Sequence, residues 1–151
     1  YNESLDLVLL NHGGIRAALP KGPIKTETAF RIMPFENQVV VVKMKGSAIL
    51  EMIDYLKIAR RAHPTSGMTL HITKKGILKK LLIQGKALSL NNVYNVATSD
   101  YLLNGGDRMD FFKKNNAVYD IDYKIRNILI DYFKEKDTLN PKRDMRFIYT
   151  K

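Results

Sequence analysis

A run of four valines that leads directly into a helix-patterned segment limits the fold of this chain more than any other feature. Residues 38–45 are predicted to form a buried strand around Val39 to Val42. Gly46-Ser47 then opens a predicted helix at about 48–61, with apolar residues at helical spacing from Ile49 to Ile58. The chain is therefore expected to pack helices against a sheet.

The other predicted elements do not alternate strictly between strand and helix. Strands are expected at 5–10, 68–73, 79–84, 93–98 and 145–149, with turns at Lys75-Gly76 and Gly85-Lys86. Helices are expected at 27–32 with Thr26 as its cap, at 109–114 as one or two turns, and at about 120–136. This order favours an α+β fold of mixed β-sheets layered with helices. Residues 1–151 are expected to form a single domain with a sizeable core.

Composition and charge exclude several classes of protein. No apolar run approaches the roughly 20 residues of a membrane-spanning helix, so no span is expected. The chain has no cysteine, which excludes disulfides and thiolate metal sites. The net charge of +10 is consistent with a solvated basic surface or with attraction of an anionic ligand. The basic pairs are scattered along the chain and no nucleic-acid motif is present, so nucleic acid is not expected as a partner.

Two glycine-rich segments carry the strongest functional signal: Asn11-His12-Gly13-Gly14-Ile15-Arg16 and Asn104-Gly105-Gly106-Asp107. Paired glycines permit left-handed backbone and close approach of another molecule. Arg16 offers a rigid fork of donors for an anion, and Asp107 offers a carboxylate for hydroxyls. Together they predict a site for a small polar anion that carries a sugar or a base.

Five segments in this order resemble the C-terminal domain of the 5′-nucleotidase family, the group of the periplasmic UDP-sugar hydrolase and ecto-5′-nucleotidase. They are Asn11 to Arg16, Pro34-Phe35 before the valine strand, Gly46 at the helix start, Ser66-Gly67 before a strand, and Tyr94 to Asp107. The resemblance covers nearly the whole chain and implies the fold of that C-terminal domain. It also implies hydrolysis of nucleotides by a partnership of two domains.

The resemblance assigns roles residue by residue. Asn11 and the backbone near Gly13 and Gly14 are expected to contact the nucleoside, and Arg16 the phosphate. The remaining expected substrate-binding residues are Phe35 and Tyr101 on the two faces of the base, Asp107 on the ribose hydroxyls, and Gly67 as backbone lining. Four of these residues also have an ordinary structural interpretation, in which Phe35 and Tyr101 pack in the core, Asp107 caps a helix and Arg16 lies on the surface.

Two positions depart from the family pattern. Arg108 follows the aspartate where the family usually has another glycine, and it either reshapes the ribose site or reaches a phosphate. Tyr101 stands where phenylalanine is common, and its hydroxyl adds a polar contact.

No metal site and no catalytic residue are expected in this chain. Its histidines are His12, His63 and His71, and no nucleophile elbow or P-loop is present. In the family a pair of divalent metal ions, of the zinc or manganese type, sits in an N-terminal metallophosphoesterase domain, which is absent from this chain. The chain begins with Tyr1 and is therefore interpreted as a truncated or processed product. It is expected to bind substrate without hydrolysing it alone.

Three functions follow, in decreasing order of support. The first is the nucleotide-binding domain of a 5′-nucleotidase-type hydrolase in nucleotide catabolism, working on a nucleoside monophosphate or related nucleotide. Its metallophosphoesterase domain lies in cis or on a separate protein, and the family implies a periplasmic, cell-surface or secreted location. The second is a stand-alone nucleotide-binding or scavenging module without catalysis. The third is a basic nucleic-acid-binding domain.

Overall fold

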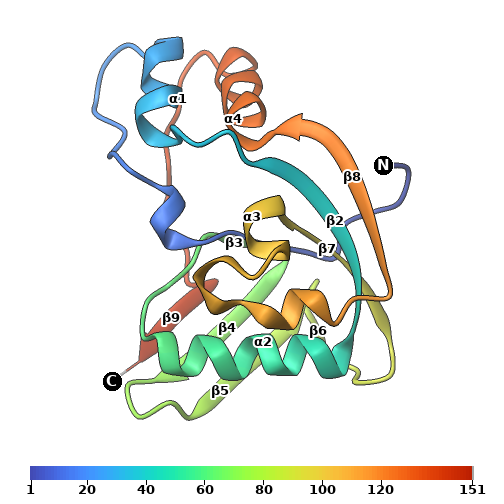
Figure 1. Cartoon of the computed structure of the whole chain (residues 1–151). Coiled ribbons are helices and arrows are strands. Elements are labelled where there is room, and N and C mark those ends of the chain that lie inside the picture. Colours follow the sequence, from blue (N-terminus) through green and yellow to red (C-terminus); the bar gives the residue numbers. More distant parts are fainter. Residues whose placement is uncertain (151) are drawn as a thin grey trace.

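The computed structural model describes residues 1–150 and contains two β-sheets (Figure 1). The larger sheet has the strand order β3-β1-β7-β2-β8, and the smaller one has the order β6-β5-β4-β9. The strands are β1 (Leu7–Leu9), β2 (Gln38–Lys45), β3 (Thr65–Ser66), β4 (Met68–Thr73), β5 (Leu78–Ile83), β6 (Lys86–Ala87), β7 (Val93–Ser99), β8 (Ala117–Lys124) and β9 (Phe147–Thr150).

The α-helices are α1 (Thr26–Ile32), α2 (Gly46–Ala59), α3 (Asp100–Leu103) and α4 (Ile125–Lys134). Short 3₁₀ turns occur at η1 (His12–Gly14), η2 (Gly106–Arg108) and η3 (Asp110–Lys113). The mixed sheets and helices confirm the predicted α+β class. Within residues 1–150, none of these helices has the length and apolar character needed to cross a membrane.

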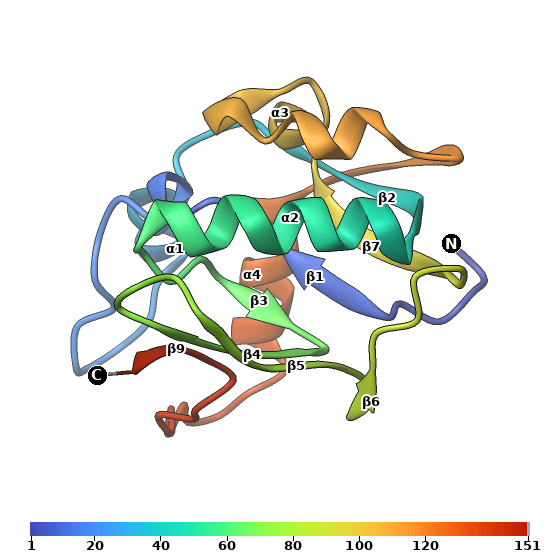
Figure 2. The same cartoon turned by 90° about the horizontal axis from the view of Figure 1, so that it is seen from below.

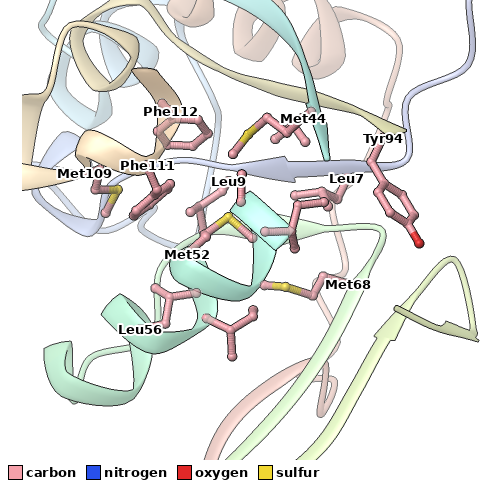
Figure 3. Packing of buried hydrophobic residues seen from close by; sticks show 14 of the residues in the cluster. Leu7, Leu9, Met44, Met52, Leu56, Met68, Tyr94, Met109, Phe111 and Phe112 are labelled. Carbon is pink, nitrogen blue, oxygen red and sulfur yellow. The ribbon is translucent and has the colours of Figure 1, made fainter. Parts of the chain in front are cut away.

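Helix α2 joins the two sheets into one core (Figures 2 and 3). Its buried face contributes Met52 and Leu56, which pack in one cluster with Leu9 of the larger sheet and Met68 of the smaller sheet. Phe112 of η3 closes the cluster. Each fully buried side chain of this size contributes roughly 1.5–3 kcal/mol, so this cluster is the main source of stability.

Strand pairing brings distant loops to one edge of the larger sheet. Strands β1 and β7 are parallel, with Val8 opposite Ala97, so the segments that follow them leave the sheet side by side. Strand β2 runs antiparallel to β7, with Val39 opposite Ser99, so the residues that precede β2 reach the same edge. This topology gathers residues 10–16, 33–37 and 99–108, although they are far apart in the sequence.

Two local predictions are wrong. The helix expected at 120–136 begins only at Ile125, because residues 117–124 pair with β2 as the edge strand β8. Backbone pairing to an open strand overrides the helical spacing of the apolar residues there. Thr26 is the first helical residue of α1 rather than its cap, and the Thr28 hydroxyl accepts a hydrogen bond from the Lys25 amide at 3.2 Å.

Candidate functional site

A polar cavity of about 290 Å³ lies at this edge of the larger sheet. Its volume is close to the lower end of the range of about 300–1,000 Å³ that is typical of small-molecule sites. The segments described above supply every lining residue: Asn11, Gly13, Arg16, Phe35, Asn37, Tyr101 and Asp107. The structure therefore brings six of the eight predicted site residues together.

The turn of residues 104–108, called the Asp107 turn, forms one wall. The Tyr101 hydroxyl donates to Asp107 Oδ1 at 2.9 Å and accepts from the Asp107 amide at 3.3 Å. This contact with the carboxylate raises the pKa of the Tyr101 hydroxyl, which therefore stays a donor at neutral pH. Tyr55 of α2 donates to the Asp107 carbonyl at 2.9 Å. One carboxylate oxygen of Asp107 thus faces Tyr101, and Asp107 forms no ion pair with any described residue.

The backbone of the Asp107 turn is left-handed at Gly105, Asp107 and Arg108, with φ of 90°, 52° and 60°. This conformation is natural for glycine but costs other residues roughly 1–2 kcal/mol. The glycine usual in the family at position 108 therefore suits this backbone better than Arg108. Gly106 has a different requirement, because a Cβ there would lie 2.4 Å from the Tyr101 ring.

The loop of residues 33–37, called the Phe35 loop, forms a second wall, to which it contributes Phe35 and Asn37. Arg126 at the start of α4 is 4% exposed and binds this loop from behind. It donates to the Pro34 carbonyl at 3.1 Å and to the Glu36 carboxylate, and its guanidinium carbon stacks 4.0 Å from the Phe30 ring centre. Lys124 pairs with the same carboxylate, and the two cations lower the pKa of Glu36 to about 2.

Both aromatic rings are open to solvent: Phe35 is 48% exposed and Tyr101 is 42% exposed. The structure therefore excludes the interpretation in which these two rings belong to the core. An exposed aromatic pair in the lining of a polar cavity is typical of a stacking site for a flat ring.

The segment of residues 11–16 forms the floor. Gly13 and Gly14 do not adopt left-handed φ angles. Their lack of a side chain therefore matters for the space that it leaves, and not for an unusual backbone conformation. A Cβ on Gly14 would lie 3.1 Å from Asn11 Oδ1, which shows how closely the asparagine side chain folds over this segment. Arg16 donates to the Gly13 carbonyl at 3.3 Å, and its guanidinium carbon lies 5.9 Å from the Phe35 ring centre. Arg16 has no carboxylate partner among residues 1–150, so its charge is available to an anion.

His63 is hydrogen-bonded to the backbone of this floor. It is 8% exposed, and its Nδ1 accepts a hydrogen bond from the His12 amide at 3.1 Å. Burial lowers the pKa of His63, although the nearby Asp107 carboxylate opposes the effect. The neutral ring is the form that can accept this bond, so burial and the hydrogen bond favour the same state.

Two predicted site residues lie outside the polar cavity. Gly14 lines an adjoining apolar cavity of about 200 Å³, which shares Asn11, Phe35 and Asn37 with the polar one. Gly67, with φ of 72°, packs against the Asp6 carbonyl and Gln84 between β3 and β4. The structure therefore does not bring Gly67 to the cavity.

Sequence reasoning missed two residues of the site. Asn37 lines both cavities and stands two residues after Phe35, a spacing that could have marked it as a neighbour on the same side of an extended segment. Arg126 gave no signal, because its role depends on contacts with residues about 90 positions earlier.

Within residues 1–150, no three histidine, cysteine, aspartate or glutamate side chains converge in a way that could hold a metal ion. The described residues therefore do not fit a two-metal centre, which needs several such ligands around ions about 3.5–4 Å apart. The cavity is instead lined by hydrogen-bonding and aromatic groups.

The cavity and the fold agree with one family of proteins. The sequence model of "5'-nucleotidase, C-terminal domain" matches residues 1–114, and the chain belongs to this family.

Individual relatives cover most of this chain. It is 31% identical to Protein UshA of Yersinia enterocolitica over 109 residues, or 68% of this chain, and 28% identical to Cell wall protein Lmo0130 of Listeria monocytogenes over 87% of it. A crystal structure of a 5′-nucleotidase precursor from Thermus thermophilus covers 97% of this chain with a TM-score of 0.85 and 25% identity. The chain spans 19% of each of the first two proteins and 32% of the third. The fold is therefore that of the C-terminal domain of 5′-nucleotidases.

Proposed function

We propose that the polar cavity binds the nucleoside part of a nucleotide, with the base between Phe35 and Tyr101. The observation that carries this proposal is the pair of solvent-exposed aromatic rings that line one cavity together with Asp107 and Arg16. Stacking of a base on an aromatic ring contributes roughly 1–3 kcal/mol and hardly depends on which base it is.

The polar groups of the cavity suit the rest of a nucleotide. Asp107 can accept hydrogen bonds from the two ribose hydroxyls, and such bonds to a charged group contribute about 1.5–3 kcal/mol each. The guanidinium of Arg16 suits phosphate oxygens because its donors form a planar fork. Asn11 and the Gly13 backbone remain for base or ribose contacts, and Asn37 adds an amide beside Phe35.

The two departures from the family pattern change this site in different ways. The Tyr101 hydroxyl donates a hydrogen bond to Asp107 Oδ1. This bond orients the Asp107 side chain and uses part of the hydrogen-bonding capacity of that oxygen. Arg108 is exposed and adds positive charge next to the aspartate. Its charge favours a substrate with phosphate groups over a neutral nucleoside.

We further infer that the domain serves a 5′-nucleotidase-type hydrolase in nucleotide catabolism. A dimetal phosphoesterase domain, in cis on a longer polypeptide or on a separate protein, supplies the hydrolytic chemistry in this proposal. Such a metal pair activates water and stabilises the charge that develops on the phosphate. The names of the relatives, a nucleotidase precursor and a cell wall protein among them, support an exported protein at the periplasm or cell surface.

Calorimetric titration of the chain with adenosine, AMP and UMP, without added metal, tests this proposal. Saturable binding is expected, and Asp107→Ala or Phe35→Ala should weaken it at least tenfold, since each removes about 1.4 kcal/mol or more. Wild-type affinity in both variants, with the fold retained, would contradict the site.

A second assay separates a hydrolase domain from a scavenging module. The chain is mixed with a metallophosphoesterase domain from a family member and Mn²⁺, and phosphate release from AMP is followed. Release that exceeds the activity of the metallophosphoesterase domain alone supports the hydrolase. Binding without such an increase supports a stand-alone nucleotide-binding module. Steeply salt-dependent binding to nucleic acid with no affinity for free nucleotides would overturn both.

A further inference from the structure

The charge of this chain is concentrated in one long segment. From Tyr55 to Ser99 the sequence contains no aspartate or glutamate. The same segment contains the basic residues Lys57, Arg60, Arg61, Lys74, Lys75, Lys79, Lys80 and Lys86. Most of the net charge of +10 therefore comes from less than a third of the chain.

The fold gathers half of these cations at one corner of the molecule. The end of α2, the turn between β4 and β5, and the end of β9 meet there (Figures 1 and 2). The Lys74 amide donates to the Thr150 carbonyl at 3.0 Å, and the Tyr149 hydroxyl binds the carbonyls of Leu56 and Arg61. A Cβ on Gly76 would lie 3.9 Å from the Lys57 carbonyl, so the turn rests on the end of the helix.

Two isoleucines stand among the cations of this corner. Ile58 is 81% exposed, more than any other large apolar side chain in the described part of the chain, and Ile77 is 53% exposed. We call the set Ile58, Arg60, Arg61, Lys74, Lys75 and Ile77 the basic tip. Its four cations form no ion pair with any residue from 1 to 150.

We propose that the basic tip docks on an anionic lipid surface. Branched apolar side chains inserted at the boundary of headgroups and acyl chains, together with lysine and arginine on phosphate groups, are the two contacts by which proteins bind such surfaces without spanning them. The stems of the basic side chains can also lie along the apolar layer while their charges stay at the headgroups.

The composition of the tip favours a bilayer over nucleic acid. None of its six residues is aromatic, so it has no ring on which bases can stack. A hydrated sugar–phosphate backbone would leave its two isoleucines in contact with water, whereas a bilayer can bury them. Each of the four cations stands within three residues of an isoleucine in the sequence, so charge and apolar surface are presented together.

Sedimentation with lipid vesicles tests this proposal on the 151-residue chain. We expect the chain to bind vesicles of phosphatidylglycerol and phosphatidylcholine, and to remain in solution with phosphatidylcholine alone. Lys74→Glu with Lys75→Glu should reduce binding by at least roughly thirtyfold, because each lost cation contributes about fivefold near such a surface and the added glutamates are repelled by it. Ile58→Ser with Ile77→Ser should also reduce binding, and its effect should persist at high salt, where charge is screened.

Lys21→Glu with Lys25→Glu is the matched control, because it makes the same change of charge at the α1 end of the molecule (Figure 1). It should retain binding within about threefold, since most of its effect is screened. Circular dichroism and the Tm should match the wild type for all three double variants. The proposal is overturned by an equal loss in the control, by equal binding to both kinds of vesicle or to neither, or by tighter binding to single-stranded DNA that the isoleucine variant leaves intact.

Discussion

The two walls of the polar cavity are held in place by different kinds of contact, one mainly local in the sequence and the other long-range. The Asp107 turn is fixed mainly by its own neighbours, through the hydrogen bonds between Tyr101 and Asp107 and a left-handed backbone. The Phe35 loop has no such internal bracing and is held by Arg126, which belongs to a helix about 90 residues later. The first wall is a local structure, and the second depends on the whole fold.

This difference predicts how each wall fails. Damage to the Asp107 turn should remain near the ribose position, because its hydrogen bonds are local apart from the one that Tyr55 of α2 donates to the Asp107 carbonyl. Damage behind the Phe35 loop should spread to α1 and α4, because Arg126 also stacks on Phe30 of α1. Stability and affinity should therefore change together at the Phe35 loop and separately at the Asp107 turn.

The largest effect is expected from Arg126→Met. The change removes a buried cation that donates to Pro34 and Glu36, and bonds to charged groups contribute about 1.5–3 kcal/mol each. We expect a loss of about 3 kcal/mol in the free energy of unfolding by urea, and at least a tenfold loss of adenosine affinity. Arg31→Met, an exposed position on α1, is the control and should change neither. Normal stability in Arg126→Met would show that the Phe35 loop is held by other contacts.

Gly106→Ala should give the next largest effect, now confined to the Asp107 turn. The added Cβ meets the Tyr101 ring, and overpacking of this kind costs about 1–3 kcal/mol. The same substitution in a Tyr101→Ala background should cost much less, because the ring is gone. A double-mutant cycle by urea unfolding measures this coupling. If the losses of stability in the two single variants simply add up in the double variant, the strain of Gly106→Ala comes from a contact other than the Tyr101 ring.

Arg108→Gly should stabilise the chain by about 1 kcal/mol, because it relieves a left-handed backbone that glycine adopts freely. Thermal unfolding provides the measurement, and Arg60→Gly, at φ of 51°, gives a comparison outside the site. If positive charge near Asp107 assists phosphate binding, Arg108→Gly should also lower the affinity for AMP more than the affinity for adenosine. Lower stability in Arg108→Gly would mean that the arginine side chain makes compensating contacts.

The pH dependence of stability should differ between the floor and the Phe35 loop. The pKa of His63 is lower in the folded chain than in the unfolded chain, so the unfolded chain takes up the proton at a higher pH. The stability contributed by the neutral ring is therefore fully present above pH 6.5 and is lost as the pH falls towards the pKa of the folded state. The lowered pKa of Glu36 adds a second loss between pH 4.5 and about 2. Urea unfolding across this range tests both, and His63→Gln should remove only the first. A first loss that survives in His63→Gln would belong to another group.

Tyr101→Phe should have the smallest effect. It removes the hydrogen bond to Asp107 Oδ1 but leaves the ring for stacking, and it releases a carboxylate oxygen for the ribose. These two consequences oppose each other, so adenosine affinity should change by less than about threefold on titration. A tenfold loss would show that the hydroxyl itself holds Asp107 in its binding position.

The same contrast explains how far the sequence alone could predict this molecule. Residues 38–45 and 68–73 were located with correct bounds, because their apolar patterns reflect buried strands. Residues 117–124 were not, since an edge strand with an exposed face lacks that pattern and is defined by its partner β2. In the site, Asp107 was predicted from a glycine-rich motif and Tyr101 from the family resemblance, and both line the polar cavity. Arg126 could not be found, because its role exists only once α4 has packed behind the Phe35 loop.

Mapping the adenosine site by amide chemical shifts in NMR spectra tests directly whether the two walls form one binding site. We expect the amides of the Phe35 loop and of the Asp107 turn to shift together with a single affinity, while those of the basic tip stay unchanged. That result would establish that two walls with different supports form one site. Shifts at one wall alone, or at neither, would contradict the claim that the polar cavity is where this domain binds its nucleotide.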